Sequence, residues 1–170
     1  MQDQPGDPRG SADPGEPLSV IAMTAFIVTG AGFLTAVLWF DLMFDVQIRR
    51  PRGADEQVLA SIAAYYRRVT TTARPMNGLV AIVMVLTLAA LVAQLVRAEA
   101  LAWVSAGSLA LAALGIGIAA AHTVRAAIRL GGRSDTLENQ TALARSIFRD
   151  HCISLAAILG VIVLQLAFAR

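Results

Sequence analysis

Residues 100–124 read ALAWVSAGSLALAALGIGIAAAHTV, a run of 25 residues without Asp, Glu, Lys or Arg. The chain holds three further uncharged stretches, Leu18–Phe40, Pro75–Val96 and Cys152–Ala169. An α-helix rises about 1.5 Å per residue, so about 20 apolar residues cross the roughly 30 Å hydrocarbon layer of a membrane. The four stretches therefore predict an all-α integral membrane protein. We expect a four-transmembrane-helix bundle with spans of about 18–45, 75–96, 100–128 and 152–169.

The composition agrees with a membrane protein, since 56% of the residues are hydrophobic and the mean hydropathy is +0.63. Residues 17–170 are expected to form one transmembrane domain. Residues 1–16 are acidic and rich in Pro and Gly, which predicts a disordered tail. This leader lacks the basic start of a secretory signal, so the first span is expected to stay attached. The basic residues flank apolar spans and form no separate polar face, so nucleic-acid binding is not expected.

The distribution of arginine predicts the orientation. All fourteen basic residues are Arg, and three of them are Arg9, Arg97 and Arg170. The other eleven lie in the two long connections: Arg49, Arg50, Arg52, Arg67, Arg68, Arg74, Arg125, Arg129, Arg133, Arg145 and Arg149. The positive-inside rule places these connections in the cytoplasm and both termini outside. Because small proteins of this plan and Arg-only, Ala-rich usage are typical of GC-rich bacteria, the sequence predicts the bacterial cytoplasmic (inner) membrane.

Both long connections contain helical patterns. Apolar residues recur every three or four positions in the first connection and predict an amphipathic helix over about 54–73: Val58, Leu59, Ile62, Tyr66 and Val69. In the second, Asp135 with Glu138 three residues later predicts a helix start, and that helix should run into the fourth span. We expect each helix to prolong the span that follows, with Pro75 bending the first junction. The alternative is that either helix lies on the membrane surface.

Two amide side chains are expected to meet inside the bundle. Gln94 and Gln165 both lie near the outer ends of their spans. Amides in hydrocarbon need hydrogen-bond partners, and a bond between two helices contributes about 1 kcal/mol. The sequence therefore predicts a hydrogen bond between these residues.

One group of ionisable residues is a candidate binding or catalytic site. Asp41 and Asp45 are spaced i, i+4 and so share a helix face, His122 closes the third span, and His151 opens the fourth. The predicted topology brings all four to the cytoplasmic end of the bundle, where ionisable groups are functional candidates. Two carboxylates and two imidazoles are able to hold a divalent transition metal, which makes these four residues a candidate metal site with Arg74 and Asn77 as polar neighbours.

Other interpretations of this Asp/His cluster stay open. The histidines could ligate haem, or the four groups could relay protons to a quinone. The simpler alternative is structural, because carboxylates at this boundary can pair with nearby Arg and imidazoles can form hydrogen bonds. No cofactor is identified by a motif.

The sequence carries no motif for turnover chemistry: no phosphate-binding Gly-rich loop, no supported Ser-His-Asp arrangement and no Cys-x-x-Cys. We therefore expect a binding or scaffold protein, or an accessory subunit, and not an enzyme. The alternative is a membrane metal-, haem- or quinone-binding redox protein, and a lipid- or small-solute-binding protein is a third class. The expected partners are the lipid bilayer and either a second copy of the chain or another membrane protein.

Overall fold

The computed structural model describes residues 16–49 and 55–169. The predicted disordered tail lies outside the described residues, apart from Glu16, which begins the first helix. The described chain forms helices and connecting turns, without a strand: α1 (Glu16–Asp45), η1 (Val46–Arg49), α2 (Glu56–Thr71), α3 (Arg74–Val96), α4 (Ala102–Ile118), η2 (Ala119–Thr123), α5 (Val124–Gly132) and α6 (Leu137–Phe168). Four helical runs are long and apolar enough to cross a membrane. The predicted all-α membrane bundle is confirmed.

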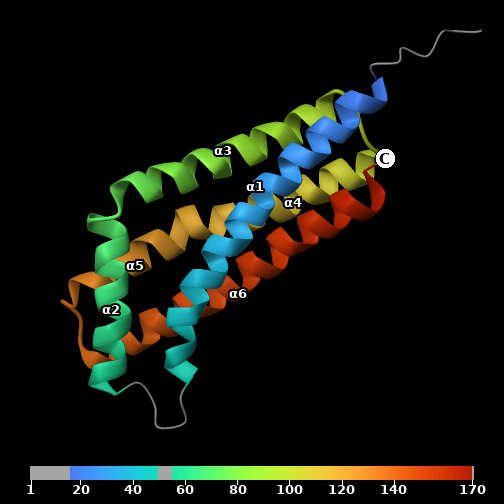
Figure 1. Ribbon diagram of the computed structural model, residues 1–170. Helices are drawn as coiled ribbons and strands as arrows, with labels where there is room; N and C mark the ends of the chain where they lie inside the picture. The colour runs from blue at the N-terminus through green and yellow to red at the C-terminus, as the bar shows by residue number, and fades with distance from the viewer. Residues whose placement is uncertain (1–15, 50–54, 170) are drawn as a thin grey trace, which may run out of the picture.

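The four spanning helices form a ring in which α1 and α4 lie diagonally opposite. Each of these two helices packs against both α3 and α6, and the four run roughly side by side in Figure 1. Their shared apolar core includes Ile27 and Leu34 of α1, Leu91 of α3 and Val161 of α6. Large apolar side chains also cover the outside of the ring, as a hydrocarbon solvent requires.

The third span changes its helical form part-way. α4, η2 and α5 make one continuous run from Ala102 to Gly132, and residues 119–123 within it are π-helical. A π turn accommodates one extra residue and rotates the residues beyond it relative to a regular α-helix. It therefore decides the direction in which His122 and Thr123 point.

α2 crosses the end of the bundle and packs against α5 (Figure 1). Its start is capped by Asp55, whose Oδ1 accepts a hydrogen bond from the Val58 amide at 2.8 Å. The apolar face predicted from the sequence is buried in a second core with α5 and the start of α6. The expectation that this helix prolongs the second span is wrong. Ala73 leaves helical geometry, and α3 begins anew at Arg74 with Pro75 in its first turn, so α2 turns away.

α6 is a single helix of 32 residues, so the second connecting helix does run into the fourth span. The predicted cap residue is wrong by one position. Thr136 caps the helix, since its Oγ1 accepts from the Asn139 amide at 3.3 Å. Asp135 instead forms an ion pair with Arg129, with Oδ1 and Nη2 2.9 Å apart.

The predicted contact between Gln94 and Gln165 is confirmed. The two amides exchange hydrogen bonds of 3.0 and 2.9 Å across the bundle, from α3 to α6. The Ser108 hydroxyl of α4 accepts a further hydrogen bond of 3.0 Å from Gln165 Nε2. This buried tie holds three spanning helices together at the end of the bundle opposite α2.

Candidate functional site

Eight polar residues form a layer between the two apolar cores. This polar layer consists of Asp41 and Asp45 of α1, Tyr65 and Tyr66 of α2, His122 and Thr123 of η2, and Asp150 and His151 of α6. On α6, for example, the layer lies between Ile147 of the core beneath α2 and Ile158 of the core inside the ring. His151 is 17 residues from the end of α6 at Phe168, which corresponds to about 26 Å of helix. A hydrocarbon layer of about 30 Å that begins near Phe168 would therefore end close to the polar layer.

Asp45 is the centre of the layer and its side chain is 1% exposed. Its Oδ1 accepts a hydrogen bond of 2.6 Å from the Tyr66 hydroxyl. Its Oδ2 lies 2.6 Å from Nδ1 of His151. With the carboxylate as acceptor, Nδ1 of His151 is the donor of this hydrogen bond. One buried carboxylate thus joins α1, α2 and α6.

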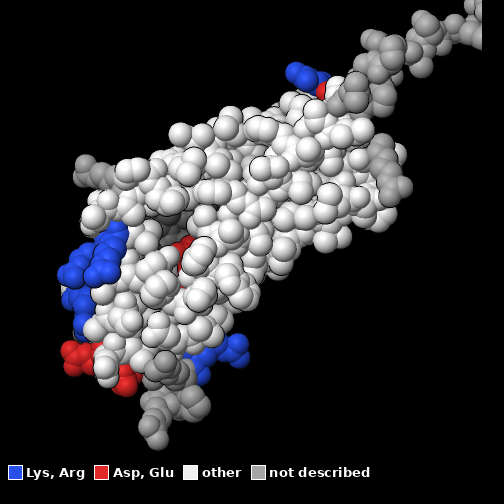
Figure 2. All heavy atoms as spheres, in the orientation of Figure 1, with Lys and Arg blue, Asp and Glu red and all other residues white. Residues whose placement is uncertain are grey.

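Asp41 occupies the next turn of α1 on the same side. Its Oδ1 accepts from the Tyr65 hydroxyl at 2.6 Å, and its Oδ2 lies 3.9 Å from Nε2 of His151. The Tyr65 ring stacks on Phe44, with ring centres 4.0 Å apart and planes 9° from parallel. The side chain of Asp41 is 16% exposed. Figure 2 shows acidic atoms at the bottom of a hollow in the uncharged surface near this end of the bundle.

The tyrosines are held as hydrogen-bond donors. Burial, and then the charge of Asp41, raise the pKa of the Tyr65 hydroxyl well above its ordinary value. Burial and the charge of Asp45 raise the pKa of the Tyr66 hydroxyl in the same way. Both hydroxyls therefore keep their protons at any physiological pH. Each tyrosine ties α2 to one carboxylate of α1.

A second carboxylate–imidazole pair lies beside the first. Asp150 Oδ2 lies 2.6 Å from Nδ1 of His122 and accepts a hydrogen bond of 3.2 Å from the Thr123 hydroxyl. Arg149 Nη2 is 3.6 Å from Asp150 Oδ1. His122 is 53% exposed, whereas Asp150 is buried. This pair joins the π-helical segment of the third span to α6.

The structure brings together three of the four residues of the predicted Asp/His cluster. Asp41, Asp45 and His151 are in contact, whereas His122 contacts Asp150 instead. Of the two polar neighbours, Asn77 donates to the Val69 carbonyl at the junction of α2 and α3, and the Arg74 side chain lies outside the described residues. Within residues 16–49 and 55–169, no three His, Cys, Asp or Glu side chains are arranged to hold a metal ion. The metal site stays a prediction.

Sequence analysis missed half of the polar layer, namely Tyr65, Tyr66, Asp150 and Thr123. Tyr66 was placed only on the apolar face of its helix. A buried tyrosine hydroxyl usually has a hydrogen-bond partner, so this position already indicated that a polar group lies opposite. Asp150 adjoins His151 in sequence, but neighbouring residues on a helix point in different directions, and its partner could not be derived from spacing.

A family model described as SHR3 chaperone, ER membrane protein SH3, matches residues 19–169. The chain belongs to this SHR3 chaperone family. The match covers all four spans and the whole polar layer. Membership indicates an accessory or chaperone-like membrane protein that associates with membrane partner proteins, and it gives no indication of redox chemistry. No curated protein and no solved structure matches the chain.

The SHR3 family corrects the predicted location. Its description as an ER membrane protein conflicts with a bacterial inner membrane, so that prediction, with its assignment of the termini to the outside of a bacterial cell, is wrong. Arg-only usage describes the composition of a genome and does not identify the compartment of a protein. The expectation of a membrane location itself is supported.

Proposed function

We propose that this protein is a membrane-embedded scaffold that holds other membrane proteins during folding or assembly and does not turn over a substrate. The observation that carries the proposal is the match of the SHR3 chaperone family to residues 19–169, because it covers the complete bundle. A chaperone-like role requires a stable frame and a surface that faces other membrane proteins. The contacts of the structure support both.

The polar layer supports the stable frame. Asp45 uses both oxygens within the chain, for Tyr66 and His151, and Asp150 is bonded to His122 and Thr123. Buried carboxylates that are satisfied in this way hold helices in a fixed arrangement. The same pattern is expected of a structural network and differs from a catalytic centre, where groups must be open to a substrate.

The outer surface supports lateral binding within the membrane. Exposed apolar side chains cover the spanning helices, among them Phe26, Val85, Leu114 and Val163. Figure 2 shows a broad uncharged body, with arginines gathered at the end formed by α2. Helices of a partner protein can pack on such a surface through van der Waals contacts, which drive association where no water is displaced.

The proposal is tested by depleting the protein from its source cells. Membrane proteins are extracted in mild detergent, aggregates are removed by centrifugation, and the soluble fraction is quantified by mass spectrometry. We expect a subset of multi-span membrane proteins to move into the aggregate and to return when the wild-type chain is restored. The same proteins should be enriched when the tagged chain is purified from cross-linked membranes. Unchanged solubility of all membrane proteins would contradict the proposal.

A further inference from the structure

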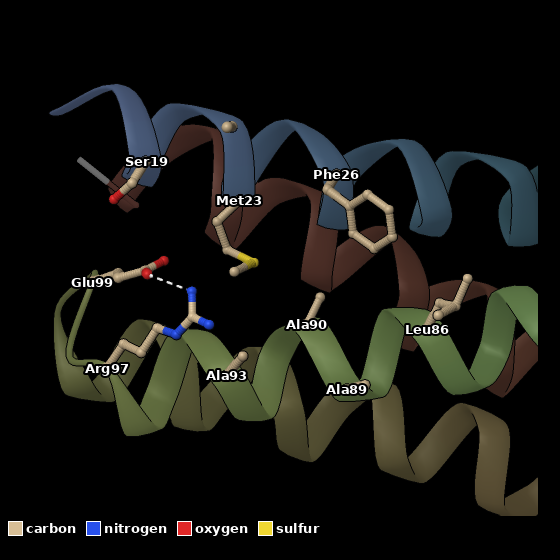
Figure 3. Close-up of a pocket in the computed structure, with 10 residues that line it drawn as sticks. Ser19, Met23, Phe26, Leu86, Ala89, Ala90, Ala93, Arg97 and Glu99 are labelled. Carbon is tan, nitrogen blue, oxygen red and sulfur yellow. Dashed lines mark hydrogen bonds and ion pairs between the residues drawn. The ribbon is translucent and has the colours of Figure 1, made fainter. Parts of the chain in front are cut away.

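An open groove of about 520 Å³ lies between α1 and α3, at the end of the bundle opposite the polar layer. Its walls are apolar, with Met23 and Phe26 from α1 facing Leu86 and Ala93 of α3 (Figure 3). Ligand sites in proteins usually have volumes of about 300 to 1,000 Å³ and apolar walls with a few polar groups. This groove has both properties, and its two charged residues, Arg97 and Glu99, lie together at one end.

The length of the groove indicates the kind of occupant. It extends along α3 from Arg97 to Leu86, which is 11 residues or about 16 Å of helix. Arg97 directly follows the span Pro75–Val96, so the charged end lies at the membrane boundary. Half of a 30 Å hydrocarbon layer is about 15 Å. The groove is therefore about one leaflet deep, which fits a lipid chain, whereas a spanning partner helix needs a groove through both leaflets.

The charged end provides a complementary pair of groups. Arg97 is 65% exposed, and its Nη1 lies 3.4 Å from Oε1 of Glu99. Such exposed ion pairs contribute little stability, so a ligand can replace this contact at small cost. Glu99 is 12% exposed, and its second oxygen, Oε2, is buried and has no hydrogen-bond partner among the residues that the structure describes. A buried acceptor without a donor is unfavourable, and a cationic donor from a ligand would satisfy it.

We propose that this groove binds one molecule of a zwitterionic aminophospholipid. One acyl chain lies between Met23 and Ala93, the phosphate contacts the Arg97 guanidinium, and the ammonium group contacts the Glu99 carboxylate. Guanidinium–phosphate and ammonium–carboxylate contacts are charge-assisted, which makes them the strong polar contacts of such a site. The site is independent of the proposed scaffold function, because it needs no partner protein.

The proposal is tested by native mass spectrometry of the full-length protein in detergent. The protein is titrated with three lipids of equal chain length: phosphatidylethanolamine, phosphatidylglycerol, which lacks the amine, and diacylglycerol, which lacks both charges. We expect one tightly bound lipid with affinity in that order. Glu99→Gln should lower the affinity for phosphatidylethanolamine about tenfold, to the level of phosphatidylglycerol. Arg97→Gln should lower the affinity for both phospholipids.

A matched pair of variants tests the apolar part of the site. Ala93→Leu fills the groove and should remove all three lipids, whereas Ala106→Leu adds the same side chain on the exposed surface of α4, outside the groove, and should leave binding unchanged. Equal affinity for the three lipids, or binding that survives Ala93→Leu, would overturn the proposal. So would retention of a second copy or another protein that Ala93→Leu displaces, since the occupant would then be a helix. Soluble glycerophosphoethanolamine has the headgroup but no acyl chains. If it displaces phosphatidylethanolamine at equal concentration, the headgroup is sufficient for binding and the proposed role of the acyl chain is contradicted.

Discussion

Asp45 and His151 are 106 residues apart in the chain and share a hydrogen bond of 2.6 Å between Oδ2 and Nδ1. Both side chains are buried, and the contact joins the first spanning helix to the last. It therefore closes the ring of spanning helices at the arginine-rich end, as Gln94 and Gln165 tie the bundle at the other end.

Asp45→Asn tests this contact directly. The variant keeps the shape of the side chain but removes its charge and leaves His151 and Tyr66 facing a poorer acceptor. We expect a loss of about 3 kcal/mol in the free energy of unfolding, measured in mixed detergent micelles. Asp41→Asn is the control, because Asp41 is partly exposed and its Oδ2 lies 3.9 Å from Nε2 of His151. This variant should lose less than half as much free energy of unfolding as Asp45→Asn. Equal losses in the two variants would contradict the central role of Asp45.

The two tyrosines predict a pH dependence at alkaline pH. Their pKa values are raised in the folded protein, so the folded state keeps protons that the unfolded state releases above about pH 10. The contribution of the two tyrosines to stability is therefore constant below that pH and falls as pH rises above it. Tyr65 and Tyr66 are the only tyrosines in the sequence, so tyrosinate absorbance reports on them alone. We expect titration above pH 10 in the folded protein and near pH 10 in denaturant.

The matched variants of this experiment are Tyr65→Phe and Tyr66→Phe. Each should lower the stability at neutral pH and reduce the slope of stability against pH above pH 10. Ionisation near pH 10 in the folded wild type would show that the hydroxyls are not held by the carboxylates.

The packing of α2 on α5 predicts different outcomes for two adjacent glycines. A Cβ at Gly131 would lie 2.9 Å from the backbone nitrogen of Arg67, whereas a Cβ at Gly132 would meet nothing within 4 Å. Gly131→Ala should lower the free energy of unfolding by about 2 kcal/mol, because two backbones must separate. Gly132→Ala should change it by no more than about 1 kcal/mol. Thermal unfolding of both variants checks this, and equal effects would contradict the close approach of the two helices.

The tie between Gln94 and Gln165 is suited to a double-mutant cycle. Gln94→Leu or Gln165→Leu leaves one buried amide without its partner, whereas the double variant removes both. We therefore expect the double variant to cost less than the sum of the single variants, with a coupling of about 1 kcal/mol. Additive losses would show that the two amides act independently.

The spans could be predicted from the sequence because hydropathy is a property of consecutive residues. The stretch Pro75–Val96 gave the same bounds that the structure finds for that span. The direction of α2 was not predicted, since it depends on the conformation of Ala73 and on the fit of Gly131 against Arg67. The second of these is a contact between residues far apart in the chain.

The candidate site was predicted in part for the same reason. Asp41 and Asp45 share a helix face by simple periodicity, and the topology brought His151 to them. The partner of His122 was not predicted. The π-helical segment at 119–123 changes the register of the third span and directs this residue to Asp150. Assigning helix faces with a constant period of 3.6 residues does not take account of the rotation that a π turn introduces.

The distance in sequence between Asp45 and His151 has a consequence for biosynthesis. Asp45 leaves the ribosome 106 residues before its imidazole partner, and at about 5 to 20 residues per second the delay is between about 5 and 20 seconds. Tyr66 is translated only 21 residues after Asp45, so the hydroxyl is available to the carboxylate long before the imidazole is. Until α6 has been made, the ring of spanning helices lacks its last member and Asp45 lacks its imidazole partner.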